Sequence, residues 1–107
     1  MDSQEFRNRA DDALQNLHRR LMIAGERYAF EADFNAGALA IEFEDPPAKF
    51  VVSPNAPVSQ IWVSALSKSF KLDWDADRGA FAVPGGPTLT ELIAENAGKL
   101  LGEEVNL

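Results

Sequence analysis

The spacing of apolar residues changes twice along this sequence, and this change constrains the fold more than any other feature. From Ser3 to about Ala24, apolar residues recur at steps of three and four, which predicts one amphipathic helix. From Phe30 to Val83 they alternate with polar residues in short runs, as half-buried strands do. After Leu89 the steps of three and four return. We therefore predict a helix, a series of strands and a second helix.

Capping residues mark the ends of both predicted helices. Asp2, followed three residues later by Glu5, resembles a capping box, and Gly25 is a suitable place for the first helix to end. Thr88 and Glu91 form the full capping-box pattern at the start of the second helix.

Short turns rich in Pro, Gly and Asn divide the middle of the chain into five or six strands, which predicts an antiparallel meander. Each strand has one apolar face and each helix one apolar stripe. We therefore predict an α+β fold, a two-layer α–β sandwich with both helices on one sheet face and the other face open to water. The predicted strands are Phe30–Phe34, Leu39–Glu44, Lys49–Ser53, Ser59–Leu66, Phe70–Trp74 and Ala80–Val83.

Composition limits the size and the chemistry of the protein. The 107 residues, 46% of them hydrophobic, suit a single domain over residues 1–107. The chain has no cysteine and one histidine, which excludes thiolate zinc sites, cysteine nucleophiles and iron–sulfur ligation by this chain alone. A net charge of -7 disfavours nucleic acid and favours cations or basic protein surfaces. No apolar run suits a membrane helix and the N-terminus resembles no targeting signal, so we expect a cytoplasmic protein with no membrane partner.

The sequence carries no arrangement typical of an active site. His18, on the first helix, is expected to be an ordinary surface histidine. The Pro84–Pro87 turn lacks the lysine and the hydroxyl residue of a phosphate-binding loop, and no Gly-x-Ser-x-Gly element is present. We therefore expect a protein that is not an enzyme.

A two-residue turn at Ala36–Gly37 sets the pairing of the first hairpin. This register places three apolar pairs face to face, which supports it. It also places Glu31 directly opposite Glu42, with Asp33 and Glu44 at diagonal positions. Clustered carboxylates suit hard cations, so one interpretation of this face is a metal site.

The alternative interpretation is a solvated acidic face without a metal. In this case Lys49, expected opposite Glu44, relieves the repulsion between the carboxylates. The residues alone leave both interpretations open.

The fourth predicted strand turns a tryptophan toward water. Ile61 and Val63 must point inward if the strand is to reach the core, which turns Gln60, Trp62 and Ser64 outward. An exposed Trp62 is a candidate for a binding interface, because tryptophan is enriched among the residues that dominate binding energy. The alternative is that a bulge or loop covers it. Trp74, in contrast, shares the inward face of its strand and is predicted to pack in the core.

The order of elements, together with one strand motif, resembles the frataxin family, specifically its bacterial iron donor members. The most specific piece is Pro-x-x-Gln-Ile-Trp at Pro57–Trp62, supported by Asn35–Leu39 in the first hairpin and by the Glu5-Phe6 and Ala10-Asp11 pairs in the first helix. The resemblance implies a monomeric α–β sandwich that binds ferrous or ferric iron weakly. It also implies docking on a cysteine desulfurase and an iron–sulfur scaffold protein, to deliver iron or to regulate cluster assembly.

Functional positions of the family map onto two groups of residues here. The strand part of an acidic iron-binding ridge maps to Glu31 and Asp33, with Glu26, Glu42 and Glu44 as supporting candidates. The partner-binding surface maps to Gln60 and Trp62, extended to Ser64, Ser53 and Asn55. Ser53 departs from the Asn that the family usually has at this place.

The end of the first helix departs further from the family pattern. Where family members cluster carboxylates, this chain has Arg19, Arg20, Met22 and Ile23, and residues 1–27 hold five acidic and five basic side chains. The loss of nearby carboxylates predicts weaker iron binding or an altered partner. A competing hypothesis is a metal-independent acidic adaptor or chaperone that uses the open sheet face and the Met22/Ile23 patch and is expected to dimerise.

Overall fold

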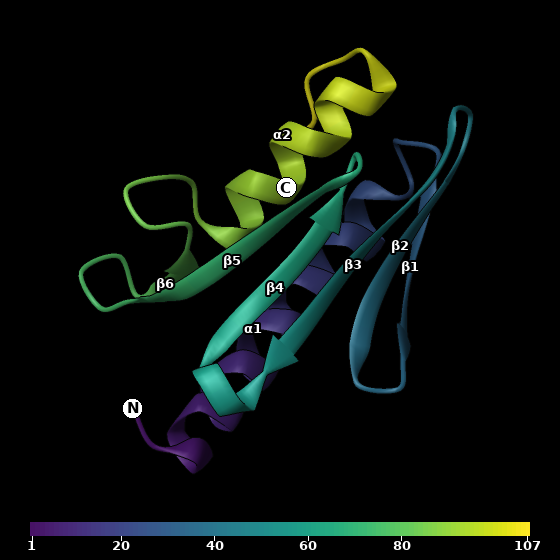
Figure 1. Cartoon of the computed structure of the whole chain (residues 1–107). Helices are drawn as coiled ribbons and strands as arrows, with labels where there is room; N and C mark the ends of the chain where they lie inside the picture. The colour runs from purple at the N-terminus through teal and green to yellow at the C-terminus, as the bar shows by residue number, and fades with distance from the viewer.

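The computed structural model describes residues 1–107 and confirms the predicted two-layer α–β sandwich. Six antiparallel strands form one sheet in the order β1-β2-β3-β4-β5-β6, so every strand pairs with its neighbour in the chain (Figure 1). The elements are α1 (Ser3–Ala24), β1 (Phe30–Asn35), β2 (Ala38–Glu44), β3 (Pro47–Asn55), a 3-10 turn η1 (Ala56–Val58), β4 (Gln60–Ala65), β5 (Lys68–Asp75), β6 (Ala80–Ala82) and α2 (Leu89–Leu101).

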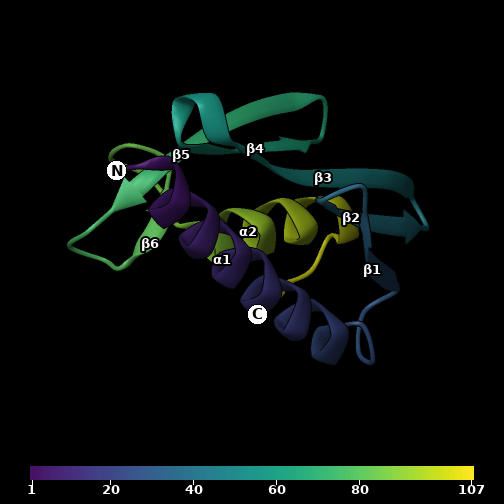
Figure 2. The same ribbon diagram turned by 90° about the horizontal axis from the view of Figure 1, so that it is seen from below.

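Both helices lie on the same face of the sheet, as Figure 2 shows. One cluster of buried side chains joins the two layers, and Phe6, Phe50 and Phe81 are among its largest members. On β4, every second residue is buried in this core, and the residues that alternate with the buried ones are exposed or half-buried. The second face of the sheet is therefore open. Neither helix combines the length and apolar character that crossing a bilayer requires.

The register of the first hairpin is as predicted. Ala36 and Gly37 form the two-residue turn with φ of 53° and 84°, and Glu31 pairs with Glu42. Phe34, which shares the inward face, stays 42% exposed. It lies near the end of a strand at the edge of the sheet, where only one neighbouring strand flanks it.

The helix ends follow their capping signals with two differences in detail. Thr88 and Glu91 complete a capping box, whereas the Asp2 carboxylate accepts a bond from the amide of Glu5 and the Glu5 side chain pairs with Arg9 instead. Gly25 caps α1 as predicted but has an ordinary right-handed φ of -60°. A Cβ there would lie 3.1 Å from the carbonyl oxygen of Phe30, so space rather than φ favours glycine.

The last residues of the chain return to the core beside α2. Val105 is buried, and the hydroxyl of Tyr28 donates a bond of 3.2 Å to the carbonyl oxygen of Glu104. A Cβ on Gly98 would lie 2.9 Å from the carbonyl oxygen of Glu103, so the tail packs directly on the backbone of α2. Residues after the second helix thus contribute to the fold.

Candidate functional site

Trp62 stands on the open sheet face with its indole held in place by hydrogen bonds. Its Nε1–H donates to Oε1 of Gln60 at 3.0 Å, and Nε2 of Gln60 donates to Oδ1 of Asp73 on β5 at 3.1 Å. The side chain is 38% exposed, which confirms the predicted outward orientation. The chain of bonds fixes the orientation of the ring without burying it.

Lys71 completes this arrangement from the neighbouring strand. It pairs with Trp62 across β4 and β5, and its Nζ lies 5.1 Å from the centre of a Trp62 ring, within the range of a cation–π contact. A hollow of about 280 Å³ lies beside the ring, and its lining residues are Val51, Ser53, Trp62, Val63, Ser64, Ser69, Phe70 and Lys71.

The residues predicted for partner binding come together on this face. Ser53 and Asn55 on β3 pair with Trp62 and Gln60, and Ser64 lies two residues further along β4. We call the surface formed by Ser53, Asn55, Gln60, Trp62, Ser64, Lys71 and Asp73 the sheet-face site.

The sequence prediction missed Lys71 and Asp73. Their positions follow from the turn that joins β4 to β5, in which Leu66 and Ser67 have φ of 51° and 63°. Positive φ is uncommon at residues other than Gly, Asn and Asp, so the turn carried no residue signal.

The carboxylates of the predicted metal site lie along the first two strands and in the turn that follows α1. Glu26, Glu31 and Asp33 line one hollow of about 470 Å³ together with Met22. Glu31 also lines a second hollow, of about 310 Å³, with Glu42 and Glu44. No three acidic or histidine side chains converge closely enough to hold one metal ion together.

The predicted position of Lys49 is wrong. Lys49 on β3 pairs with Glu42, and Glu44 pairs with Pro47. The two-residue turn at Asp45 and Pro46 lets β3 begin at Pro47, so Lys49 pairs with a residue two positions earlier on β2 than predicted. Lys49 therefore lies directly opposite Glu42, a member of the Glu31/Glu42 pair, and not opposite Glu44.

His18 is more than a surface histidine. Its Nε2 lies 3.2 Å from the carbonyl oxygen of Ala32 on β1, and the centre of its ring lies 4.9 Å from that of Phe34. The side chain is half-buried and connects α1 to the edge strand beside the acidic residues.

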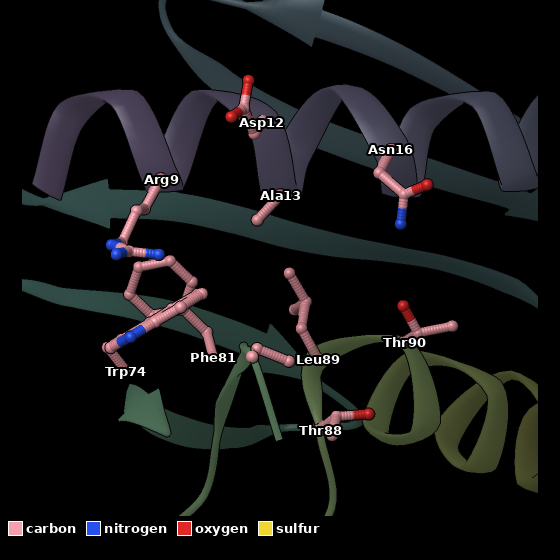
Figure 3. Close-up of a pocket in the computed structure, with 11 residues that line it drawn as sticks. Arg9, Asp12, Ala13, Asn16, Trp74, Phe81, Thr88, Leu89 and Thr90 are labelled. Carbon is pink, nitrogen blue, oxygen red and sulfur yellow. The ribbon is translucent and has the colours of Figure 1, made fainter. Parts of the chain in front are cut away.

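A fourth hollow, of about 330 Å³, lies between α1, β5, β6 and the start of α2 (Figure 3). Arg9 reaches over Trp74 at its mouth, with the guanidinium carbon 4.2 Å from a ring centre. Trp74 packs edge-on against Phe81 and against the core as predicted, but it remains half-buried rather than fully enclosed. At this hollow, the N-terminus of α2 is already capped by the side chains of Thr88 and Glu91.

Two carboxyl groups have clearly lowered pKa values, and both serve turns or caps. The pKa of Glu91 is lowered chiefly by the backbone N–H of Thr88 and then by its hydroxyl. The pKa of Asp75 is lowered chiefly by the side chain and then the backbone N–H of Arg78. Arg78 also donates to the carbonyl oxygen of Gly86 at 2.7 Å, which ties two loops together.

Comparison with known proteins agrees with this architecture. A family model described as a frataxin-like domain matches residues 1–103. The chain is 28% identical over 101 residues to the iron-sulfur cluster assembly protein CyaY of Azotobacter vinelandii, covering 94% of this chain and 89% of that protein. A solved structure of frataxin from Psychromonas ingrahamii is similar in fold, with a TM-score of 0.84 and 22% identity over 99% of this chain and 97% of that one.

Proposed function

The chain belongs to the frataxin-like family, and we propose that it serves as a non-enzymatic accessory protein of iron–sulfur cluster assembly. In this role it docks on a cysteine desulfurase and its scaffold protein, and it delivers iron to them or regulates their activity. It acts as a monomer in the cytoplasm. The CyaY relative, named for iron–sulfur cluster assembly, supports the pathway.

The held, exposed indole of Trp62 is the observation that most favours docking through the sheet-face site. A large aromatic ring fixed in one orientation loses little conformational freedom when a partner covers it, so more of its burial energy contributes to affinity. The Gln60 bond at 3.0 Å provides this fixation. The hollow beside the ring offers room for a partner side chain.

Iron is proposed to bind as cargo along the acidic edge of the sheet. Glu31 and Asp33 are the principal ligands, and the supporting ones are Glu26, Glu42 and Glu44. Carboxylate oxygens suit hard iron ions, and the side chains line two adjoining hollows. All five are exposed, so water and salt screen their attraction for a cation, which fits weak and reversible binding.

Docking is tested with the cysteine desulfurase of the same organism by calorimetric titration. Trp62→Ala is expected to weaken binding by about tenfold or more, as removal of an interface hot spot does. Trp62→Phe retains a ring but loses the bond to Gln60, so it is expected to fall between wild type and Trp62→Ala. Lys99→Ala, on the exposed side of α2 in the other layer, is the control. Equal affinity of wild type and Trp62→Ala would reject the sheet-face site.

Iron binding is tested by following backbone amide signals in NMR during titration with ferrous iron. Selective broadening near Glu31 and Asp33 is expected, and Glu31→Gln with Asp33→Asn is expected to remove it. Glu95→Gln on α2 is the matched control, because it removes one exposed carboxylate from another surface. Uniform broadening in wild type would reject a defined site and favour the metal-independent adaptor.

A cluster-assembly assay with desulfurase and scaffold addresses the role itself. The rate of cluster formation is expected to change on addition of this protein and to change less with Trp62→Ala. Sedimentation at two concentrations is expected to give one monomeric species, whereas a stable dimer would favour the adaptor.

A further inference from the structure

The outer side of α1 near its end carries two large apolar side chains that no other part of the chain covers. Met22 is 56% exposed and Ile23 is 68% exposed, the highest values among the large apolar side chains. On the opposite side of the same turns Leu21 and Ala24 are buried, so the core is complete without Met22 and Ile23. Their exposure is a property of the surface rather than a gap in packing.

Two arginines adjoin these apolar side chains. Arg19 lies three and four residues before Met22 and Ile23, and Arg20 lies three residues before Ile23, so helical spacing brings all four side chains together. Both arginines are exposed, and neither takes part in the ion pairs of the structure, which join Arg9 to Glu5 and Arg78 to Asp75. We call Arg19, Arg20, Met22 and Ile23 the helix-end patch.

We propose that the helix-end patch is a second docking surface, separate from the sheet-face site, that binds an acidic protein segment with an apolar centre. Met and Arg are enriched in protein interfaces. The apolar side chains supply area to bury, and the two unpaired guanidinium groups select carboxylates. In a chain with a net charge of -7, these two unpaired positive side chains let the patch discriminate between partners by charge.

A narrow protein segment fits this surface better than a membrane or a nucleic acid does. The hollow beside Met22 is also lined by Glu26, Glu31 and Asp33. A wide anionic surface would have to approach these carboxylates, whereas a segment can lie over Ile23 and the arginines. At physiological salt, exposed charges more than about 8 Å apart are largely screened from each other, so binding depends mainly on the side chains in direct contact. A second copy would add its own net charge of -7, which opposes self-association.

The proposal is tested by NMR titration of the whole protein with two synthetic peptides. Both peptides carry the same leucine stripe, and one has Glu where the other has Lys. Saturable shifts of the amide signals of residues 19–27 are expected with the Glu peptide only. Arg19→Glu with Arg20→Glu is expected to weaken this binding by about tenfold, and Met22→Ser with Ile23→Ser by a similar factor.

Arg7→Glu is the matched control, because Arg7 is exposed and unpaired on the same helix but lies more than two turns away. Circular dichroism of each variant checks the fold. The proposal is overturned by equal responses to both peptides, by shifts that fall outside residues 19–27, or by absence of shifts. It is equally overturned if vesicles of phosphatidylglycerol bind and the Glu peptide does not, or if sedimentation shows the patch mediating a dimer.

Discussion

The guanidinium group of Arg9 lies over the ring of Trp74, with its carbon 4.2 Å from a ring centre, and so connects α1 to β5 (Figure 3). The same group pairs with Glu5 at 3.1 Å. A half-exposed cation–π contact contributes about 0.5–1 kcal/mol and an ion pair on one helix about 0.3–0.5 kcal/mol.

Arg9→Ala is therefore expected to lower the free energy of unfolding by about 1 kcal/mol. Arg9→Lys keeps the charge but loses the flat group that stacks on Trp74, so it is expected to recover only part of the loss. Urea denaturation measures each variant. If Glu5→Gln, which removes the ion pair alone, costs as much as Arg9→Ala, the contact with Trp74 contributes nothing.

Val105→Ala tests whether the tail stabilises the fold. It removes two buried carbon atoms and is expected to cost about 1.5 kcal/mol, at about 0.8 kcal/mol for each buried CH₂. Glu103→Ala is the exposed control from the same tail. A Val105→Ala variant as stable as wild type in urea would mean that the tail packs only passively.

Glu91 is expected to make stability depend on pH in the acid range. Its pKa is lower in the folded protein than its ordinary value of 4.5, so its contribution is complete above that value and is lost as the pH falls through the lowered pKa. Glu91→Gln is expected to be less stable than wild type at pH 7, and the difference is expected to shrink well below pH 4.5. Glu95→Gln is the control on the same helix, and thermal unfolding at several pH values measures all three proteins.

Glu31→Lys is expected to stabilise the protein while it removes a proposed iron ligand. Glu31 pairs directly with Glu42, and replacing a like-charge pair on a sheet by an opposite-charge pair gains about 0.2–1 kcal/mol. Asp33→Lys lies opposite Ala40, so it makes no such cross-strand pair and is expected to leave stability nearly unchanged. Chemical denaturation compares the two variants, and equal effects would show that the Glu31/Glu42 repulsion is negligible.

The architecture could be predicted from the sequence because the spacing of apolar residues, the turn residues and the cross-strand pairs all indicated the same arrangement. Three apolar pairs and a Gly37 with positive φ specify one hairpin register, so Glu31 could be placed opposite Glu42 without a structure. The alternation on β4 placed Trp62 outward for the same reason. Period and turn chemistry together leave few alternatives for a short antiparallel meander.

Contacts between distant segments could not be predicted in this way. The bond from His18 to Ala32 depends on how α1 crosses the edge strand, and the position of Arg9 over Trp74 depends on how it crosses β5. Neither crossing leaves a periodic signal in the sequence. The error at Lys49 had a local cause, since Pro47 already begins the strand and the turn is shorter than its prolines suggest.

The two edges of the sheet determine the direction from which a partner can approach. At one edge, β1 carries Glu31 and Asp33, and His18 of α1 reaches the backbone of Ala32. At the other edge β6 has only three residues, and Ala82 pairs with Thr88. Charged or very short edge strands resist the addition of a foreign strand. Recognition by strand addition is thereby disfavoured at both margins, which favours partners that contact side chains on a broad surface, and growth of the sheet into a fibre is disfavoured for the same reason.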